Sequence, residues 1–452
     1  MTAPAPRSAT CPALLIAAGA SGQGKTTVTA ALARLHARQG RRVRVFKCGP
    51  DYLDPYWHQL ASGAPVQNLD LWMTGWDDCA ARLHAAAQEA DLLLIEGVMG
   101  LFDGSDSVAD LAQRTGVAVL AVVDASAMGG TLGAIVHGLK TYRPGLPWAG
   151  VLANNVAGER HAQMLQAGLQ DSADWLGGLP RLGRSAGGAL LPERHLGLVA
   201  AHELPDALPR LDAAADALAA TPLGQLDGAA LQRFAVDFAP PPPQAAIPPL
   251  LAGRTVAVAR DAAFAFIYPA NLQTLAQLGA RVVFFSPLAG EHLPPCDAVW
   301  LPGGYPELHA EKLAANTALQ AGLRAHAATG KALWAECGGM MALAESILLP
   351  DGRELPLWGL LPGRVTLHQR LAGLGPQQLE LPQGVLRGHT FHYSTLACTA
   401  PVGTRTTRPG QGVAQGTGEA VYRQGSLQAS YFHAWFASSP EATAALFLEV
   451  VL

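Results

Sequence analysis

Cysteine is scarce and scattered in this chain of 452 residues. None of the six cysteines forms a C-x-x-C pair, and no regular spacing relates them. This pattern argues against a disulfide framework and against a zinc site. A reducing cytoplasm is therefore the expected compartment. The cysteines are Cys11, Cys48, Cys79, Cys296, Cys337 and Cys398.

Long apolar runs and clusters of charge are also missing. No apolar stretch reaches the ~18 uninterrupted residues that a membrane-spanning helix needs. Arg7 precedes an apolar run, as in a signal peptide, but that run leads into a glycine-rich segment and we expect it to be retained. Charged residues make up 15% of the chain, the net charge is -4, and Lys and Arg are scattered. Nothing marks a nucleic-acid or membrane surface, so small molecules are the expected partners.

Half of the residues are apolar, and the chain is too long for one ordinary core. Up to about residue 235, short β-branched runs at 42–46, 91–95, 117–123 and 150–153 alternate with Ala- and Leu-rich helical stretches. This alternation predicts a parallel, doubly wound sheet. Prolines at 240–243 then interrupt the pattern, as a stiff linker does. We therefore predict a first domain at 1–238, a linker at 239–250 and a second domain at 251–452.

The second domain repeats the α/β alternation, with strand-like runs at 254–259, 281–285, 298–301 and 332–335. From about Leu360 the chain has more Gly, Thr and short strand-like runs, which predicts an antiparallel edge on the second sheet. The expected fold class is α/β, with two doubly wound open-sheet domains.

A nucleotide-phosphate loop of the form G-x-x-x-x-G-K-T lies between the first expected strand and the helix after it. Its glycines let several amide N–H groups point at one phosphate, its lysine neutralises phosphate charge, and its threonine hydroxyl suits Mg²⁺. The motif therefore predicts binding of ATP with Mg²⁺. Its residues are Gly19, Gly22, Gly24, Lys25, Thr26 and Thr27.

Two acidic segments follow expected strands at their carboxyl ends, where open α/β sheets bind ligands. The segment 46–55 carries Lys47 and Asp51, and the segment 95–104 carries Glu96 and Asp103. Glu96 stands where a nucleotide enzyme of this fold places its Mg²⁺-directed carboxylate. We interpret the histidines of this half as surface or capping residues and assign none to a metal: His58, His137, His161, His195 and His202.

The second domain carries a candidate nucleophile, Cys337, at an expected strand-to-helix turn. The amino-terminal end of the following helix is expected to lower the pKa of this thiol, and turn N–H groups can face an oxyanion. Gly304 follows another strand and is expected to present a second N–H group. His433 is a candidate base. His389 and His392 compete with it, because sequence spacing does not decide among the three.

Taken in order, these segments resemble the cobyrinic acid a,c-diamide synthase family of glutamine amidotransferases. The resemblance implies a phosphate-loop domain like that of dethiobiotin synthetase, followed by a class I glutamine amidotransferase domain. It also implies ATP- and Mg²⁺-dependent amidation of the a and c acetate groups of a cobalt-containing corrinoid in cobalamin biosynthesis, with glutamine as nitrogen donor. The matching segments are 19–27, 47–55, 95–104, 192–198, 301–307, 336–339, 391–394 and 429–433.

The resemblance also implies roles for particular residues. It selects His433 as the partner of Cys337 and brings Glu96 to the ATP and metal. The turn after Cys337 itself offers Gly338 as an oxyanion donor beside Gly304, and the phosphate-loop motif offers Thr26 to the metal. Many class I glutaminases have a glutamate two residues after the histidine, where this chain has Trp435, so a Cys-His dyad is expected. The residues implied around the substrate carboxylates are Lys47, Asp51, Tyr52, Leu53 and Asp103.

Three alternatives stay open on the sequence alone. One is an enzyme of the same kind acting on metal-free hydrogenobyrinic acid, and another acts on a nickel tetrapyrrole precursor. The third is a nucleotide-dependent switch whose second domain is a non-catalytic binding module, which intact Cys337 and His433 disfavour. The sequence leaves the oligomeric state open, with a homodimer as the candidate assembly.

Overall fold

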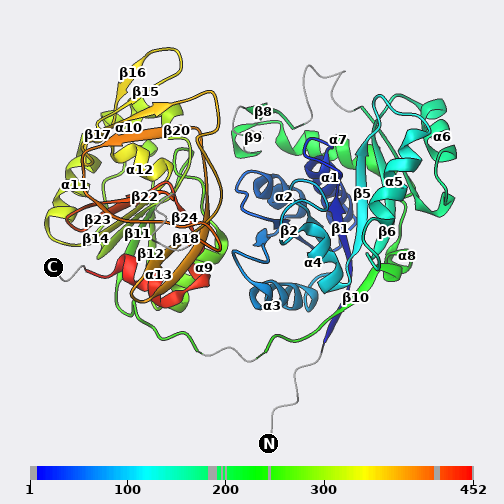
Figure 1. Ribbon diagram of the computed structural model, residues 1–452, viewed down its shortest axis with the longest axis horizontal. Helices are drawn as coiled ribbons and strands as arrows, with labels where there is room; N and C mark the ends of the chain where they lie inside the picture. The colour runs from blue at the N-terminus through cyan, green and yellow to red at the C-terminus, as the bar shows by residue number, and fades with distance from the viewer. Residues whose placement is uncertain are drawn as a thin grey trace, which may run out of the picture. The chain divides into compact units, whose positions relative to one another are not determined.

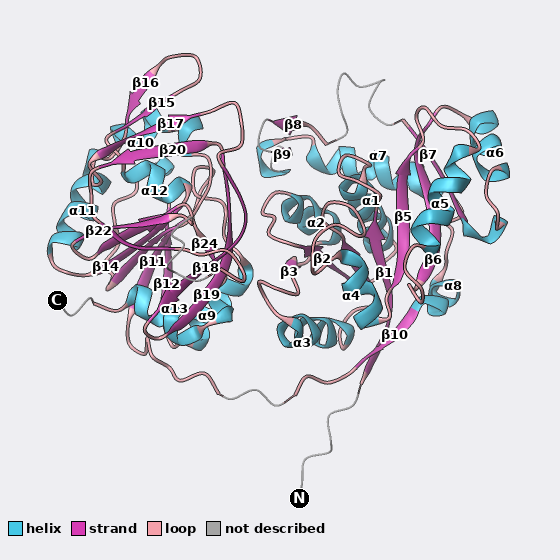
Figure 2. Cartoon of the chain, viewed as in Figure 1, coloured by secondary structure: helices cyan, strands magenta, loops and turns pink. Residues whose placement is uncertain are grey.

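The computed structural model describes residues 8–181, 191–194, 197–198, 201–242, 246–411 and 418–449. The chain divides into two compact units, Met1–Gln244 and Ala245–Leu452. Figure 1 traces the described elements of both units along the chain, and Figure 2 distinguishes their helices from their strands. No described helix is long and apolar enough to cross a membrane.

The first unit is built on a sheet whose strand order is β3-β2-β4-β1-β5-β6-β7. These strands run parallel to one another, and β10 pairs antiparallel with the start of β1. The parallel sheet predicted from the alternating runs is confirmed. The strands are β1 (Ala9–Ala17), β2 (Val43–Cys48), β3 (Gln67–Leu69), β4 (Leu92–Glu96), β5 (Ala118–Asp124), β6 (Trp148–Val156), β7 (Trp175–Pro180) and β10 (Ala235–Phe238).

Helices cover both faces of this sheet. Successive strand residues point to opposite faces, so the apolar strands present side chains for the helices to bury on each face. Leu14 belongs to the buried apolar cluster that includes residues of α1, α2 and α7, whereas Leu15 belongs to the cluster that includes residues of α3, α4, α5 and α6. Both leucines are fully buried. The helices are α1 (Lys25–Arg38), α2 (Asp54–Ser62), α3 (Trp76–Ala87), α4 (Val108–Thr115), α5 (Thr131–Thr141), α6 (Glu159–Ala167), α7 (Ala207–Ala219) and the short α8 (Gly228–Leu231).

The second unit contains a seven-stranded sheet in the order β12-β11-β13-β14-β23-β22-β21. Its strands are parallel from β12 to β23, and β22 and β21 then add the predicted antiparallel edge. They are β11 (Thr255–Ala259), β12 (Arg281–Phe285), β13 (Ala298–Leu301), β14 (Ala332–Glu336), β21 (Val402–Arg405), β22 (Ala420–Gln424) and β23 (Leu427–Ser430). The helices are α9 (Pro269–Gln277), α10 (Ala310–Ala315), α11 (Thr317–Ala328), α12 (Gly338–Leu343) and α13 (Pro440–Phe447).

Two smaller sheets complete the second unit, and the sequence patterns do not predict them. One joins β15 (Ser346–Leu348), β16 (Glu354–Pro356), β17 (Gly363–Leu367) and β20 (Ser394–Cys398). The other joins β18 (Gly373–Leu381), β19 (Gly384–His392) and the two-residue strand β24 (His433–Ala434). The second sheet matters for the site, because it pairs His433 with His389.

Candidate functional sites

The phosphate loop connects β1 to α1, and its glycines have the backbone that the motif requires. Gly22 and Gly24 have φ values of 77° and 95°, in the left-handed region that favours glycine. A β-carbon on Gly24 would come within 2.2 Å of Asn154 Nδ2, so a side chain there would also clash. Lys25 donates to the carbonyl oxygens of Ala20 and Met99 at 3.1 and 2.7 Å. Burial lowers the pKa of Lys25.

The segment after β4 lies against the phosphate loop. Gly97 N–H and Leu101 N–H donate to the carbonyls of Ile16 and Ala18, both at 2.8 Å. Asp103 accepts from Gly100 N–H at 2.8 Å, so the predicted substrate residue closes the loop that packs beside Gly19. The structure thus brings the segment 95–104 to the phosphate loop.

Three acidic side chains and a lysine form a cluster beside Thr26. Glu96 is fully buried, and its Oε1 accepts from the Thr26 hydroxyl at 2.7 Å. Lys47 Nζ lies 3.0 Å from the same oxygen, 2.5 Å from Asp54 Oδ2 and 3.7 Å from Asp51 Oδ2. Burial alone would lower the pKa of Lys47, but these carboxylates raise it well above its ordinary value. The cluster is therefore held together by one buried ammonium group.

The pKa values of two of these carboxylates, Glu96 and Asp51, are shifted in opposite directions. Burial would raise the pKa of Glu96, but the charge of Lys47 and the contact with His58 outweigh burial and lower it. Burial and the nearby charge of Asp54 raise the pKa of Asp51. Asp51 Oδ1 accepts from the N–H groups of Leu53 and Asp54 at 2.9 and 3.2 Å, which fixes the start of α2. The predicted residue Tyr52 lies in this turn.

Two residues of this cluster were missed in the sequence. Asp54 Oδ2 accepts from the Thr26 hydroxyl at 3.2 Å, and His58 Nε2 contacts Glu96 Oε2. His58 is fully buried, so its interpretation as a surface or capping residue is wrong. Asp54 and His58 are four residues apart on α2 and therefore share a helix face. That spacing is the signal that could have found them.

The oxygen atoms of Thr26, Asp54 and Glu96 fit a magnesium ion. Mg²⁺ prefers hard oxygen ligands and is commonly bound by one or two carboxylates together with phosphates and water. Within the described residues, no group of three or more His, Cys, Asp and Glu side chains could hold a metal by itself. Such an ion would therefore need oxygen atoms from a bound phosphate as well.

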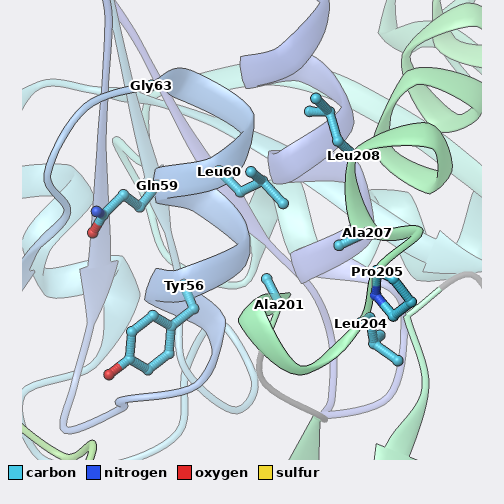
Figure 3. A pocket seen from close by; sticks show the side chains of 9 residues that line it. All are labelled: Tyr56, Gln59, Leu60, Gly63, Ala201, Leu204, Pro205, Ala207 and Leu208. Atoms are coloured by element: carbon cyan, nitrogen blue, oxygen red, sulfur yellow. The ribbon is translucent and has the colours of Figure 1, made fainter. Parts of the chain in front are cut away.

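A groove lies on another face of α2 (Figure 3). It has a volume of about 540 Å³ and contains no charged side chain, so it suits apolar surface rather than phosphate or carboxylate. Figure 3 shows Leu60 of α2 facing Leu208 of α7 across it. The lining residues are Tyr56, Gln59, Leu60, Gly63, Ala201, Leu204, Pro205, Ala207 and Leu208.

In the second unit, Cys337 sits on a strained turn between β14 and α12. Its φ and ψ are 44° and -106°, a conformation that non-glycine residues rarely adopt. Its N–H donates to Ser430 O at 2.7 Å, which anchors the turn to the end of β23. The side chain is 6% exposed. The predicted strand-to-helix elbow is therefore present.

The expected lowering of the thiol pKa is wrong. Burial and the nearby Glu307 raise the pKa of Cys337, although the Gly338 N–H favours the thiolate. Helix α12 has only six residues, so its amino-terminal end is a weak source of positive potential. Glu307 is itself buried, and burial raises its pKa to about 7. The thiol therefore needs a base.

The backbones of Gly304 and Gly338 pack closely against each other. A β-carbon on Gly338 would come within 2.8 Å of both Gly304 N and Gly304 O. Gly304 has a φ of 159° and passes so close to Ala263 that its own β-carbon would lie 2.1 Å from Ala263 O. This contact between two glycine backbones places the two predicted oxyanion donors in one small region.

His433 lies against the neighbouring Gly303. A β-carbon added to Gly303 would come within 2.4 Å of the imidazole Cε1. Gly303 therefore lies against the His433 imidazole, and Gly304 lies against Gly338, the residue after Cys337. His433 is 1% exposed, and burial together with the neighbouring His389 lowers its pKa well below the ordinary value.

The two competing histidines have other contacts. His389 stacks on His433, with ring centroids 4.8 Å apart, and contacts the Tyr268 hydroxyl at 3.4 Å. His392 contacts Glu419 Oε1 at 3.1 Å and Ser394 O at 2.7 Å. His433 packs against the Gly303 backbone, beside the oxyanion glycines, which favours it as the partner of Cys337.

One segment of the family resemblance lies partly outside the described residues. In the segment 192–198, Glu193–Arg194 (β8) and Gly197–Leu198 (β9) form a short antiparallel pair, whereas His195 and Leu196 are not described. The prolines at 240–242 are described, and residues 243–245 of the predicted linker are not.

Two family models match the chain. The model described as the CobQ/CobB/MinD/ParA nucleotide binding domain matches residues 14–194, and the CobB/CobQ-like glutamine amidotransferase domain matches residues 255–441. These ranges contain the phosphate-loop cluster and Cys337 with His433, respectively.

Curated relatives match almost the whole chain. Hydrogenobyrinate a,c-diamide synthase of Stutzerimonas stutzeri is 55% identical over 97% of this chain and 99% of its own length. The protein of the same name from Pseudomonas aeruginosa is 54% identical over 97% and 98%. Cobyrinate a,c-diamide synthase of Herminiimonas arsenicoxydans is 48% identical over 96% of each chain. The chain belongs to the family of cobyrinate and hydrogenobyrinate a,c-diamide synthases.

Proposed function

We propose that the chain is a glutamine-dependent ligase that uses ATP to convert the a and c acetate carboxylates of a corrinoid into amides, as a step of cobalamin biosynthesis. One observation carries the proposal. A single chain of this family contains both the cluster around the phosphate loop and the second site, with Cys337, His433 and the glycines between them. The first suits carboxylate activation and the second suits release of ammonia.

The first half-reaction makes the carboxylate reactive. A carboxylate oxygen attacks the γ-phosphorus of ATP, ADP leaves, and an acyl phosphate forms. Lys25 and the loop N–H groups stabilise charge on the transferring phosphoryl group. Lys47, Asp51, Tyr52, Leu53 and Asp103 surround the incoming carboxylate in this proposal. Thr26, Glu96 and Asp54 would hold Mg²⁺, which would neutralise phosphate charge.

The second half-reaction releases ammonia. His433 accepts the Cys337 proton, and the thiolate attacks the side-chain amide of glutamine. The N–H groups of Gly304 and Gly338 stabilise the oxyanion, and the His433 imidazolium returns its proton to the amide nitrogen as the C–N bond breaks, so that ammonia leaves. Water then hydrolyses the resulting thioester to glutamate and the free thiol. Burial lowers the pKa of His433, so its imidazole is neutral near pH 7; the same shift makes it a weaker base, and the proton transfer is therefore proposed to be coupled to the attack of sulfur on glutamine.

The two half-reactions are joined by ammonia. Its lone pair attacks the acyl carbon, phosphate leaves with the electrons of the C–O bond, and a proton is lost. Because ammonium predominates near neutral pH and is not a nucleophile, the ammonia must reach the acyl phosphate before it is protonated.

The macrocycle can carry cobalt or lack it. The family resemblance implies the cobalt form, with hydrogenobyrinic acid as the alternative. The relatives at 55% and 54% identity carry the hydrogenobyrinate name, and the one at 48% carries the cobyrinate name. Since the names of the two more similar proteins agree, we propose metal-free hydrogenobyrinic acid as the preferred substrate. We further propose a cytoplasmic homodimer with small-molecule partners only.

Competition between the two macrocycles tests the proposal. The purified protein is supplied with ATP, Mg²⁺, glutamine and an equal mixture of hydrogenobyrinic acid and cobyrinic acid, and the amidated products of each are followed by mass spectrometry over multiple turnovers. We expect diamide from both, with a higher kcat/KM for the metal-free acid. ATP hydrolysis that ignores glutamine and both macrocycles would overturn the proposal and favour the nucleotide-switch alternative.

A further inference from the structure

A buried carboxyl group connects the strand of Cys337 to the strand of His433. Glu336 is the last residue of β14, immediately before Cys337, and is 1% exposed. Its Oε1 accepts from Ala434 N–H at 3.2 Å and from the Trp334 indole N–H at 2.8 Å. Ala434 directly follows His433. One side chain therefore joins the residue before the nucleophile to the residue after the histidine.

Strand β24 depends on such side-chain contacts, because it is only two residues long. Its ladder partners are Gly388 and His389 of β19. Asn271 holds the same turn from α9, donating to Ala434 O at 2.8 Å and accepting from Phe436 N–H at 2.9 Å. Asn271 therefore fixes the carbonyl of Ala434, and Glu336 fixes its N–H.

The residue two positions after the histidine does not supply a carboxyl group. Trp435 is buried and packs edge-on against Tyr268, with ring centroids 4.9 Å apart. This chain has Trp435 where many class I glutaminases have a glutamate, and its buried carboxyl group, Glu336, comes from β14 instead. Glu336 acts on the backbone next to His433 rather than on the imidazole.

We propose that Glu336 is a positioning residue for the glutaminase reaction, and that its bond to Ala434 N–H sets where the His433 imidazole lies relative to Cys337. This inference rests on the proposed function. The bond needs an oxygen acceptor at the right distance and needs no negative charge. Burial raises the pKa of Glu336 to about 8, so the carboxyl group is neutral near pH 7 and adds no negative charge beside the thiolate.

Three substitutions separate acceptor, distance and charge. Glu336→Gln keeps an oxygen at the same distance, Glu336→Asp keeps a carboxyl group but withdraws it by about 1.5 Å, and Glu336→Met keeps the length without the oxygen. Each variant is assayed for glutamine hydrolysis, for alkylation of Cys337 by a glutamine analogue carrying a γ-diazoketone, and for amidation driven by ammonium salt.

We expect the Gln variant to stay within about threefold of the wild-type kcat, and the Asp and Met variants to fall by about 100-fold, as for a small misplacement of a reacting group. KM for glutamine is expected to stay within about twofold, because Glu336 does not contact the substrate in this account. Ammonium-driven amidation is expected to be unchanged. Glu354→Gln is the control, because Glu354 is an exposed glutamate of the same unit, and its kcat should stay near that of the wild type.

The rank order decides the outcome. An Asp variant that is faster than the Gln variant would show that charge matters and would overturn the proposal, as would a Met variant with wild-type kcat. If the Met variant does not fold, the comparison of Gln with Asp gives the same decision. A wild-type protein that is neither alkylated at Cys337 nor able to hydrolyse glutamine would instead overturn the proposed function itself.

Discussion

The imidazole of His433 lies so close to Gly303 that a β-carbon on that glycine would meet Cε1 at 2.4 Å. Real β-carbons do not approach other heavy atoms so closely, so Gly303→Ala must displace the imidazole. Because a small misplacement of a reacting group can cost about 100-fold in rate, we expect glutamine hydrolysis to fall by about 10- to 100-fold. Ammonium-driven amidation should be retained, and steady-state assays with both nitrogen sources measure the difference.

Gly403→Ala is the control for this substitution. Gly403 lies in β21 of the same unit, and a β-carbon there would meet its neighbours at 3.5 Å or more. Glutamine hydrolysis should be unchanged in this variant. Equal activity of the two alanine variants would contradict the placement of His433.

Substitution of Glu96 should lower amidation with both nitrogen sources and leave glutamine hydrolysis in place. The Glu96 carboxylate contacts the Thr26 hydroxyl and the Lys47 ammonium. In Glu96→Gln this charge is lost at the place where ATP and Mg²⁺ are proposed to bind, so we expect amidation to fall by about 100-fold or more with glutamine and with ammonium alike. Hydrolysis of glutamine should persist. Glu89→Gln, at an exposed glutamate of the same unit, is the control; loss with only one nitrogen source would contradict the assignment.

Removal of Lys47 should destabilise the first unit. Its side chain is 4% exposed and lies 2.5 Å from Asp54 and 3.0 Å from Glu96. Lys47→Met leaves these carboxylates buried without a counter-charge, which costs about 3–5 kcal/mol in comparable buried pairs. Urea denaturation measures the change in the free energy of unfolding. Arg42→Met removes an exposed ion pair with Asp91 and should have little effect. A similar stability of the two variants would show that the cluster does not depend on its lysine.

The stability of the protein should depend on pH through Glu336. Burial raises the pKa of this carboxyl group from 4.5 to about 8 in the folded protein. Between these values the folded state keeps a proton that the unfolded chain releases, so this group's contribution to stability is full below about pH 4.5 and is lost as the pH rises toward 8. The Glu336→Gln variant has no carboxyl group to ionise at this position, so it does not lose this stability as the pH rises. Its Tm relative to the wild type should therefore rise between pH 5 and pH 8, whereas a constant difference would contradict the buried, neutral carboxyl group.

The sheets and the phosphate loop were readable from the sequence because their signals are local. A β-branched run is followed by a helical stretch and then by another run, and the three glycines of the phosphate loop lie within six residues of one another. The structure confirms the two α/β sheets on this basis. The small sheets of the second unit have no such signal, because β24 is only two residues long and pairs with a strand more than 40 residues earlier.

The contacts inside the sites were harder to predict because they depend on burial. His58 looks like any helix residue until the fold places it against Glu96. The thiol of Cys337 was expected to be acidified by its helix, and the structure shows that burial outweighs that effect. Glu336 stands next to Cys337 in the sequence, but its bond to Ala434 joins residues 98 positions apart.

The most direct test of the central claim follows nitrogen from its source to the product. Wild-type protein and Cys337→Ala are each given ATP, Mg²⁺ and the corrinoid with amide-¹⁵N glutamine or with ¹⁵N-ammonium, and the label in the product is measured by mass spectrometry. The account predicts that the wild type takes label from both sources, whereas the variant takes none from glutamine and a wild-type amount from ammonium. Label from glutamine in the variant at the wild-type rate would contradict it.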